Sequence, residues 1–337
     1  MPDIESKSRT VIITGGTAGV GRAIAHRFAR AGDRVGVIAR DAAALADVRE
    51  ELQRIGAEVA VESVDVADAE AVFAAARRLE QQLGKVDVWV NDAMETVFST
   101  VADMTPHEFR RVTEVTYLGF VHGTMAALKS MRPRRHGRII QIGSALAYRG
   151  IPLQSAYCGA KHAIRGFTNS LRTELLHEGC GIRICIVELP AVNTPQFDWA
   201  RVHIAHSPRP MGRPIQPEVV ADAVFRAARG SWREYWLGVP TFATILGNTL
   251  LPGFLDRFLA RSAIAGQQTA TAVSADRADN LDEPVTALHR TRGSFSAESS
   301  SWAPLVPGEI ARVGTVAAAA LLMFALGASF GWWRRAR

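Results

Sequence analysis

Short apolar runs alternate with amphipathic stretches through the first half of the chain. The apolar runs span 11–14, 34–39, 59–63, 86–91, 138–142 and 183–188, and Ala-rich amphipathic segments such as 42–55 and 68–83 lie between them. Regular alternation of strands and helices is typical of βαβ units, and strands that are apolar throughout suit a sheet covered on both faces. The pattern predicts an α/β fold with a doubly wound parallel sheet.

The pattern changes after about residue 230. Residues 234–239 predict a last strand, and the uncharged stretch that follows, up to residue 255, is interrupted by Asn248 and Pro252. A proline inside a helix removes a hydrogen bond and clashes with the preceding turn, so we expect broken helices. We interpret residues 236–264 as an extension that covers a pocket. A re-entrant or interfacial membrane segment is the alternative.

Two further segments follow this extension. Residues 265–310 are rich in Ala, Ser, Thr, Asp and Pro without a sustained apolar period, which predicts a disordered linker. Residues 313–333 carry no charge and end in two tryptophans, just before a cluster of arginines. About twenty apolar residues match the hydrocarbon thickness of a bilayer, so we predict a transmembrane helix over 311–333. The alternative is an amphipathic or buried C-terminal helix.

Composition and charge narrow the class of protein. The chain is 48% hydrophobic, and its net charge of +6 is not gathered into a basic stripe interleaved with aromatic residues, so we expect no nucleic-acid partner. Cys158, Cys180 and Cys185 have neither disulfide nor metal-ligand spacing, which predicts buried thiols and no metal site. Residues 1–10 are polar, so no secretory signal is expected, and the catalytic part is predicted to be cytoplasmic.

A glycine-rich turn follows the first apolar run. Residues 14–21 read Thr-Gly-Gly-Thr-Ala-Gly-Val-Gly, and an amphipathic stretch comes next. In a strand, turn and helix of this order, backbone N–H groups at the helix N-terminus can approach a pyrophosphate, because glycine has no Cβ to block it. The spacing differs from the commoner dinucleotide motif, so the loop alone is equally compatible with a tight turn.

Tyr157 and Lys161 lie four positions apart, and Ser144 ends an apolar run upstream of them. On a helix this spacing places phenol and ammonium on one face. A cation beside a phenol lowers the pKa of the phenol from about 10, which suits a general acid/base near neutral pH. Taken alone, such a pair is more often a solvated surface contact.

Together these motifs resemble the short-chain dehydrogenase/reductase family, whose signature joins a TGxxxGxG loop to a downstream serine and a YxxxK pair. The resemblance covers residues 8–235. It implies a Rossmann-type fold in one catalytic domain, 1–235, and hydride transfer between a nicotinamide and a carbonyl or secondary alcohol. It also implies that Tyr157 exchanges the proton, that Lys161 hydrogen-bonds the nicotinamide ribose, and that Ser144 polarises the reacting oxygen.

The resemblance also implies which positions bind the dinucleotide. Asp65 and Val66 match the adenine-contacting pair, Thr194 matches a carboxamide contact, and Asn91 matches a residue that stabilises the sheet and lines the cofactor cleft. The full set of cofactor-binding positions expected on this basis is Thr14, Gly15, Thr17, Gly19, Val20, Gly21, Arg40, Asp65, Val66, Asn91, Ala93, Tyr157, Lys161, Pro190 and Thr194.

The chain departs from the family pattern at two places. Thr116 stands where the family usually has an asparagine that holds a water in a proton relay, and Met94 stands where glycine is common. A hydroxyl has one donor and cannot reproduce an amide, so we list Thr116 as a catalytic candidate with an altered relay. We expect Thr116 and Met94 to change the efficiency of the proton relay more than the affinity for the cofactor.

The choice of cofactor depends on the end of the second strand. Family members that bind NAD usually have an acid there, whereas this chain has Ala39 followed by Arg40. A guanidinium suits a 2′-phosphate, so we predict NADP in preference to NAD, and Arg22 is a second cation nearby. In the alternative, Arg40 is an exposed strand end and Asp41 turns inward.

The sequence therefore predicts a membrane-anchored, NADP-dependent oxidoreductase that acts on a lipophilic small molecule. An apolar substrate wall supports this prediction, although core packing explains the same residues equally well. A homo-oligomer is implied by the resemblance. The alternative is a non-catalytic, membrane-tethered nucleotide-binding scaffold or sensor, motivated by Thr116 and Met94. The expected wall consists of Leu146, Tyr148, Ile151, Leu153, Phe197 and Trp199.

Overall fold

The structure, a computed structural model, describes residues 8–317 of the 337-residue chain. Its main sheet has the strand order β12-β10-β7-β6-β4-β1-β2-β3. Neighbouring strands are parallel except β12, which runs antiparallel to β10. The strands are β1 (Thr10–Thr14), β2 (Arg34–Ala39), β3 (Val59–Ser63), β4 (Val86–Asn91), β6 (Gly137–Ile142), β7 (Ile182–Glu188), β10 (Glu234–Leu237) and β12 (Leu305–Pro307).

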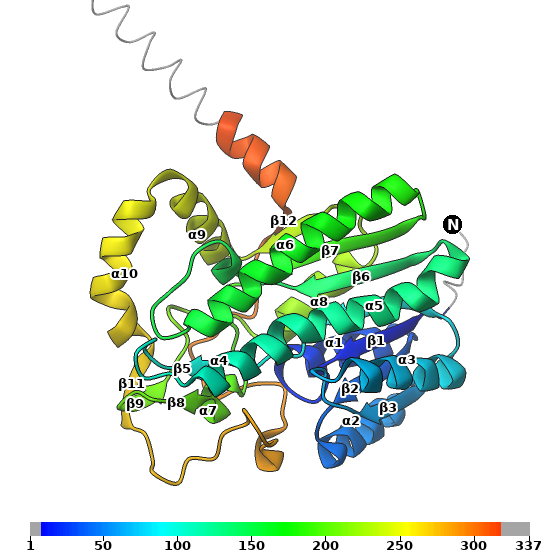
Figure 1. Cartoon of the computed structure of the whole chain (residues 1–337), viewed down its shortest axis with the longest axis horizontal. Coiled ribbons are helices and arrows are strands. Elements are labelled where there is room, and N and C mark those ends of the chain that lie inside the picture. The colour runs from blue at the N-terminus through cyan, green and yellow to red at the C-terminus, as the bar shows by residue number, and fades with distance from the viewer. Residues whose placement is uncertain (1–7, 318–337) are drawn as a thin grey trace, which may run out of the picture.

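Helices cover both faces of this sheet (Figure 1). One buried cluster joins the sheet to α1, α2 and α8, and a second joins the other face to α3, α5 and α6. The helices are α1 (Gly19–Ala29), α2 (Ala42–Arg54), α3 (Ala69–Leu83), α4 (Pro106–Thr113), α5 (Gly119–Met131), α6 (Ser155–Glu178), α7 (Gln196–Trp199), α8 (Pro217–Ala227), α9 (Val239–Leu250) and α10 (Pro252–Gly266). The predicted doubly wound α/β sheet is confirmed.

The register of the central strands brings the ends of β1, β2 and β4 to one edge. Thr14, the last residue of β1, pairs with Ile38 on one side and Asn91 on the other. The loops that follow these three strands therefore leave the sheet side by side. The chain order reverses between β1 and β4, and a sheet of this kind binds ligands in the crevice outside such a point.

Side-chain caps explain where several helices begin. Asp41 accepts hydrogen bonds from the first N–H groups of α2, and Asp68 does so for α3. Thr105 and Glu108 form a reciprocal capping box on α4. Helix α1 differs, because Ala18 precedes it and no side chain caps its N-terminus. Its first N–H groups are therefore left to acceptors other than its own cap, and that of Gly19 donates to the carbonyl of Arg290 at 3.0 Å.

The segment predicted to be a disordered linker, 265–310, is instead packed on the domain. It forms β11 (Gln268–Ala272), which pairs with β9 (His206–Pro208), a short turn at Thr286–Leu288, and β12 at the edge of the main sheet. Its order comes from hydrogen bonds to distant residues rather than from a periodic apolar face. The prediction for this segment was wrong for that reason.

The predicted membrane span lies largely outside the described residues. Residues 308–317 are helical, and the remainder of 311–333 follows the last described residue. Within the described range 8–317, no helix is both long enough and apolar enough to cross a bilayer.

Candidate functional site

A cavity of about 610 Å³ lies at the carboxyl edge of the sheet. It runs from the glycine-rich turn and the ends of β2 and β4 to Tyr157, and α9 and α10 contribute residues such as Pro240 and Leu259 to its wall. A volume of this size falls in the range of small-molecule and cofactor sites. The predicted site residues that line it are Gly15, Thr17, Gly19, Val20, Arg40, Asp65, Val66, Ala93, Ser144, Tyr157, Lys161, Pro190 and Thr194.

The glycine-rich turn passes close to β4 and to its own helix. A Cβ on Gly15 would lie 2.6 Å from the Cα of Ala93, and Gly15 has a φ of +78°. A Cβ on Gly21 would lie 2.3 Å from the carbonyl oxygen of Gly15. Only glycine fits these two positions, and the turn can therefore bring the uncapped start of α1 to the cavity wall.

Four predicted site residues do not line the cavity. Gly21 acts through the close approach just described. Thr14 is buried, and its hydroxyl accepts a hydrogen bond from the backbone N–H of Asp92 at 3.3 Å. These two residues shape the cleft from beneath instead of contacting its contents.

Asn91 is also buried beneath the cleft and does not line it, which corrects the prediction. Its amide oxygen accepts a hydrogen bond from Trp89, and its amide nitrogen donates to Thr124 and Gln141 at 3.1 and 2.8 Å. Asn91 therefore joins β4 to α5 and β6. The expected role in the sheet is observed, whereas the expected contact with the cleft is not.

Thr116 does not present a free hydroxyl to a proton relay. It lies in a π-helical turn, Glu114–Leu118, and is fully buried. Its hydroxyl donates to the carbonyl of Glu95 at 3.0 Å and accepts from the N–H of the same residue at 2.9 Å. The hydroxyl is thus occupied by the backbone after β4, and Thr116 holds that loop in place.

Ser144, Tyr157 and Lys161 meet at one end of the cavity. Ser144 follows β6, and the other two residues lie on the first turns of α6. The Ser144 side chain hydrogen-bonds the Tyr157 phenol. The Lys161 ammonium lies 5.5 Å from the centroid of the Tyr157 ring and donates to the carbonyl of Ile142 at 2.8 Å. The three predicted catalytic groups are therefore brought together.

Burial dominates the acid–base character of these groups. It raises the pKa of the Tyr157 phenol above its ordinary value, and the hydrogen bond with Ser144 opposes this only in part. The sequence predicted a lowered pKa, but the Lys161 ammonium bonds a backbone carbonyl instead of the phenolic oxygen. Burial lowers the pKa of Lys161, against the attraction of Asp92 and Glu188. Tyr157 is therefore held in its protonated form.

Glu188, which the sequence reading missed, lies behind this group at the end of β7. It is fully buried, and neither carboxyl oxygen has a hydrogen-bond partner among side chains and backbone of the described residues. A Cβ on Gly143 would lie 2.2 Å from one of these oxygens, so only glycine leaves room for the carboxyl. A charged residue inside the apolar run Ile-Val-Glu-Leu was the available signal.

Arg40 lines the cavity, but its guanidinium is not free as predicted. One terminal nitrogen donates to the carboxylate of Glu95 at 2.6 Å and to the carbonyl of Asn280. The other donates to the carbonyls of Leu281 and Asp282 at 3.3 and 3.0 Å. The cation is therefore positioned by a segment far away in the sequence.

The predicted apolar wall is partly present. Leu146, Ile151, Phe197 and Trp199 line the cavity, together with Leu255 and Phe258 of α10. Tyr148 and Leu153 do not line it. Tyr148 instead hydrogen-bonds Glu234, and Leu153 is buried, so both belong to the supporting structure.

A family model, two relatives by sequence and one solved structure all relate this chain to dehydrogenases, reductases or oxidoreductases. Residues 9–202 match the model of a family described as short chain dehydrogenase. "Uncharacterized oxidoreductase YxnA" of Bacillus subtilis (strain 168) is 31% identical over 75% of this chain and 72% of its own length. "Dehydrogenase/reductase SDR family member 7B" of Mus musculus is 32% identical over 76% and 82%. An alcohol dehydrogenase from the archaeon Thermococcus sibiricus, complexed with 5-hydroxy-NADP, superposes with a TM-score of 0.59 at 26% identity and covers 68% of this chain and 96% of its own.

The buried carboxyl of Glu188 makes stability depend on pH. Burial raises its pKa to about 8, whereas a glutamate in an unfolded chain titrates near about 4.3. Between these values the folded state binds more protons than the unfolded state, so stability falls as the pH rises. For Glu188→Gln we expect the free energy of unfolding, relative to wild type, to increase by at least about 1 kcal/mol from about pH 5 to pH 8.

Denaturant unfolding at a series of pH values measures this difference. Glu174→Gln changes an exposed carboxyl on α6 and is the matched control, which should follow the wild-type curve. Parallel curves for wild type and Glu188→Gln would show that the carboxyl is not protonated in the folded state.

Proposed function

This chain belongs to the short-chain dehydrogenase family, and we propose that it is an NADP-dependent oxidoreductase that interconverts a carbonyl and a secondary alcohol. One observation carries the proposal: Tyr157, Ser144 and Lys161 converge on the wall of a cavity that also contains the glycine-rich turn. A non-catalytic nucleotide sensor has no need of a buried phenol beside a hydroxyl and an ammonium. The geometry therefore favours the enzyme over the scaffold.

The side chains of this site supply proton transfer and orientation. A bound dinucleotide would supply or accept the hydride. Tyr157, held protonated by burial, donates its proton to the carbonyl oxygen, and Ser144 hydrogen-bonds the same oxygen as negative charge develops on it. Lys161 places a positive charge beside the resulting phenolate. A protonated phenol is the form needed for carbonyl reduction, and the phenolate is the form needed for the reverse oxidation.

Two observations support NADP as the cofactor. Arg40 lines the cavity at the end of β2, and no acid occupies the preceding position, Ala39. The structurally similar alcohol dehydrogenase was solved with an NADP derivative. The Gly15–Val20 turn and the uncapped α1 N-terminus would hold the pyrophosphate, and Asp65 and Val66 would lie beside the adenine.

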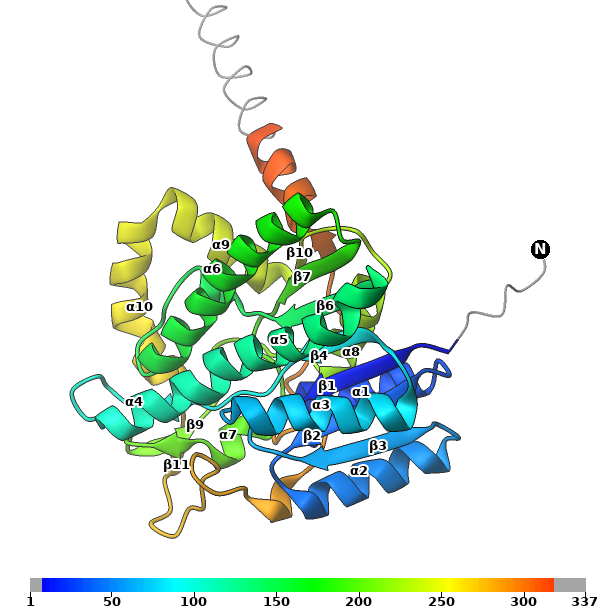
Figure 2. The same ribbon diagram turned by 45° about the vertical axis from the view of Figure 1, so that its right-hand side comes forward.

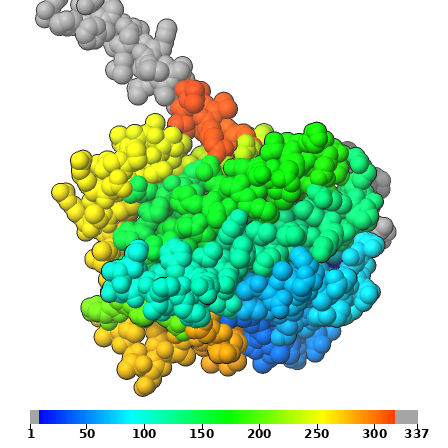
Figure 3. All heavy atoms as spheres, in the orientation of Figure 1, coloured from blue at the N-terminus to red at the C-terminus, as the bar shows by residue number. Residues whose placement is uncertain are grey.

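The described surface supports membrane attachment, and the apolar side chains that line the cavity support a lipophilic substrate. Leu250 and Phe254, at the turn between α9 and α10, are 67% and 62% exposed, and Val313 of the C-terminal helix is 69% exposed. Both elements lie at the same end of the molecule (Figure 3). We propose that the segment predicted as 311–333 spans the membrane from Val313 onward, because Ala311 is buried on the domain and Arg312 pairs with Glu234. The catalytic domain would lie on the cytoplasmic side, and α9 and α10 would meet the lipid surface. Assembly into a homo-oligomer stays a prediction.

Removal of the phenol should abolish reduction but not cofactor binding. For Tyr157→Phe we expect kcat with NADPH and a hydrophobic ketone to fall by roughly 10²-fold or more, because the proton donor is lost. NADPH oxidation measures the rate, and nucleotide fluorescence measures the Kd.

Tyr235→Phe is the matched control, since this buried hydroxyl has no partner within the described residues and lies outside the cavity. Equal activity of wild type and Tyr157→Phe would reject the mechanism. NADPH binding by the wild-type protein without turnover of any ketone tested would favour the scaffold.

The guanidinium of Arg40 should discriminate between the two dinucleotides. For Arg40→Gln we expect the Kd of NADPH to rise roughly tenfold more than the Kd of NADH, because only NADPH carries a 2′-phosphate. Titration of both nucleotides against wild type and variant gives the ratio. An unchanged ratio would exclude Arg40 as the phosphate ligand.

The membrane proposal is tested by removing the C-terminal segment. We expect the full chain to sediment with membranes and to resist extraction by high salt, because apolar burial is insensitive to screening. A chain ending at residue 312 should lose most of this association. Release of the full chain by salt alone would show that attachment is electrostatic and not a membrane span.

A further inference from the structure

A segment near the C-terminus crosses the mouth of the cavity. Residues 279–293, here called the strap, follow β11 and reach the region of α2 and the glycine-rich turn (Figure 2). The family match ends at residue 202, so the strap lies outside the matched region. Its role therefore has to be inferred from its own contacts.

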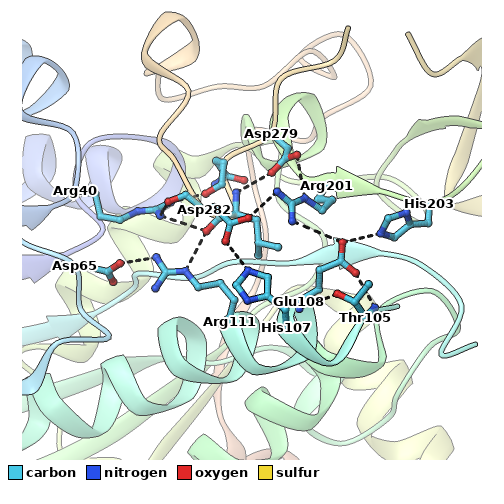
Figure 4. Close-up of polar contacts among 12 residues, drawn as sticks. Arg40, Asp65, Thr105, His107, Glu108, Arg111, Arg201, His203, Asp279 and Asp282 are labelled. Atoms are coloured by element: carbon cyan, nitrogen blue, oxygen red, sulfur yellow. Dashed lines mark hydrogen bonds and ion pairs between the residues drawn. The ribbon is translucent and has the colours of Figure 1, made fainter. Parts of the chain in front are cut away.

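The first end of the strap is held beside α4. Arg201 donates to the carboxylates of Asp279 and Asp282 at 3.0 and 2.8 Å, and the His107 ring lies 2.9 Å from the other oxygen of Asp282 (Figure 4). Arg111 donates to the carbonyl of Leu281 at 3.1 Å. The carboxylates of Asp279 and Asp282 are thus paired with Arg201 and do not line the cavity, where they would repel a phosphate.

Leu281 anchors this end by burial. Its side chain is fully buried in a cluster with Val97, Val112 and Ala156, against which Tyr157 packs. The guanidinium of Arg40 donates to the backbone carbonyls of residues 280–282, as described above. The same stretch of strap is therefore tied both to the catalytic tyrosine's surroundings and to the residue expected beside the adenosine ribose.

The second end of the strap is held at the glycine-rich turn. The carbonyl of Arg290 accepts a hydrogen bond from the N–H of Gly19 at 3.0 Å, and the carbonyl of His289 accepts from Arg22 at 2.8 Å. The N–H of Gly293 donates to the carbonyl of Asn193 at 3.1 Å. The strap is therefore fastened on both sides of the cleft.

The inner face of the strap forms part of the cavity wall. Asn280, Pro284, Val285 and His289 line the cavity together with the glycine-rich turn, Arg40 and Asp65. The His289 ring also packs on Trp199, with 5.5 Å between ring centroids. An apolar surface with a planar ring and no carboxylate suits an adenine nucleoside. The cavity persists beneath the strap, so the strap covers this space without filling it.

We propose that the strap is the outer wall of the dinucleotide site, closing over the adenosine half of NADP(H), and that the cofactor enters and leaves only when the strap is released. This inference rests on the proposed function. It predicts that weakening the Asp279 and Asp282 contacts accelerates dissociation of NADPH and NADH alike, because the strap covers the part that both share. Arg40 donates to the strap and is also expected to bind the 2′-phosphate, so its loss should weaken the binding of both dinucleotides but that of NADPH more strongly.

The test uses the full chain carrying Asp279→Asn and Asp282→Asn together. These side chains do not line the cavity. We expect the dissociation rate and the Kd of both dinucleotides to rise by roughly threefold to tenfold, as for the loss of partly exposed ion pairs. Asp222→Asn, which removes a partner of Arg27 on the surface, is the control and should leave both quantities unchanged. Nucleotide fluorescence in a stopped-flow instrument measures them.

Hydrogen exchange of the wild-type chain gives a second readout that needs no variant. The N–H groups of Asn280 and Gly293 donate to the carbonyls of Trp199 and Asn193, and NADPH should slow their exchange if the strap closes over the cofactor.

Faster exchange with NADPH, or tighter NADPH binding in the double variant, would show that the strap competes with the cofactor for the site and would overturn the proposal. Unchanged rates in the double variant would also overturn it. A full chain that binds neither dinucleotide would refute the proposed function itself.

Discussion

Parallel pairing of β1 with both β2 and β4 positions the part of the site where the dinucleotide is expected to bind. The pairing aligns Thr14, Ile38 and Asn91, so the loops after the three strands leave the sheet at one edge. Two glycines then let the turn after β1 lie against β4 and against its own helix, with no room for a Cβ at either place. Without this close approach the start of α1 would be displaced from the cavity, and the backbone donors expected to hold a pyrophosphate would be lost.

Burial affects the pKa values of Tyr157 and Lys161 more than any ion pair or hydrogen bond does. Tyr157 is kept protonated, while Lys161 carries its charge near the carboxyls of Asp92 and Glu188. The side chain of Glu188 is unusual in lacking any hydrogen-bond partner within the described residues, although it is fully buried. A buried carboxyl of this kind is costly unless it is protonated. Tyr157 and Lys161 therefore lie beside two carboxyls, Asp92 and Glu188, whose charges affect the pKa of Lys161.

The C-terminal third converts an open cleft into a covered one. Helices α9 and α10 form a wall of the cavity, the strap spans the cleft, and β12 joins the edge of the main sheet. Several backbone carbonyls of the strap accept hydrogen bonds from arginines of the family-matched region, such as Arg40 and Arg111. Arg40, the cation proposed to bind the 2′-phosphate, would thus serve both cofactor recognition and closure of the cleft.

Residue patterns along the chain were enough to predict the parallel sheet and the glycine-rich turn, because these depend on local periodicity and on spacing within single elements. The grouping of Ser144 with Tyr157 and Lys161, which lie on another element, was predicted from the family resemblance. It could not be predicted in this way that Asn91 is buried beneath the cleft, or that Thr116 bonds the backbone of Glu95, since these hydrogen bonds join residues on different elements. The strap was mistaken for a linker because one buried leucine and scattered carbonyl contacts leave no periodic signal. Tertiary structure alone decided which side chains face the cavity, since that depends on partners up to 267 positions away, as between Arg22 and His289.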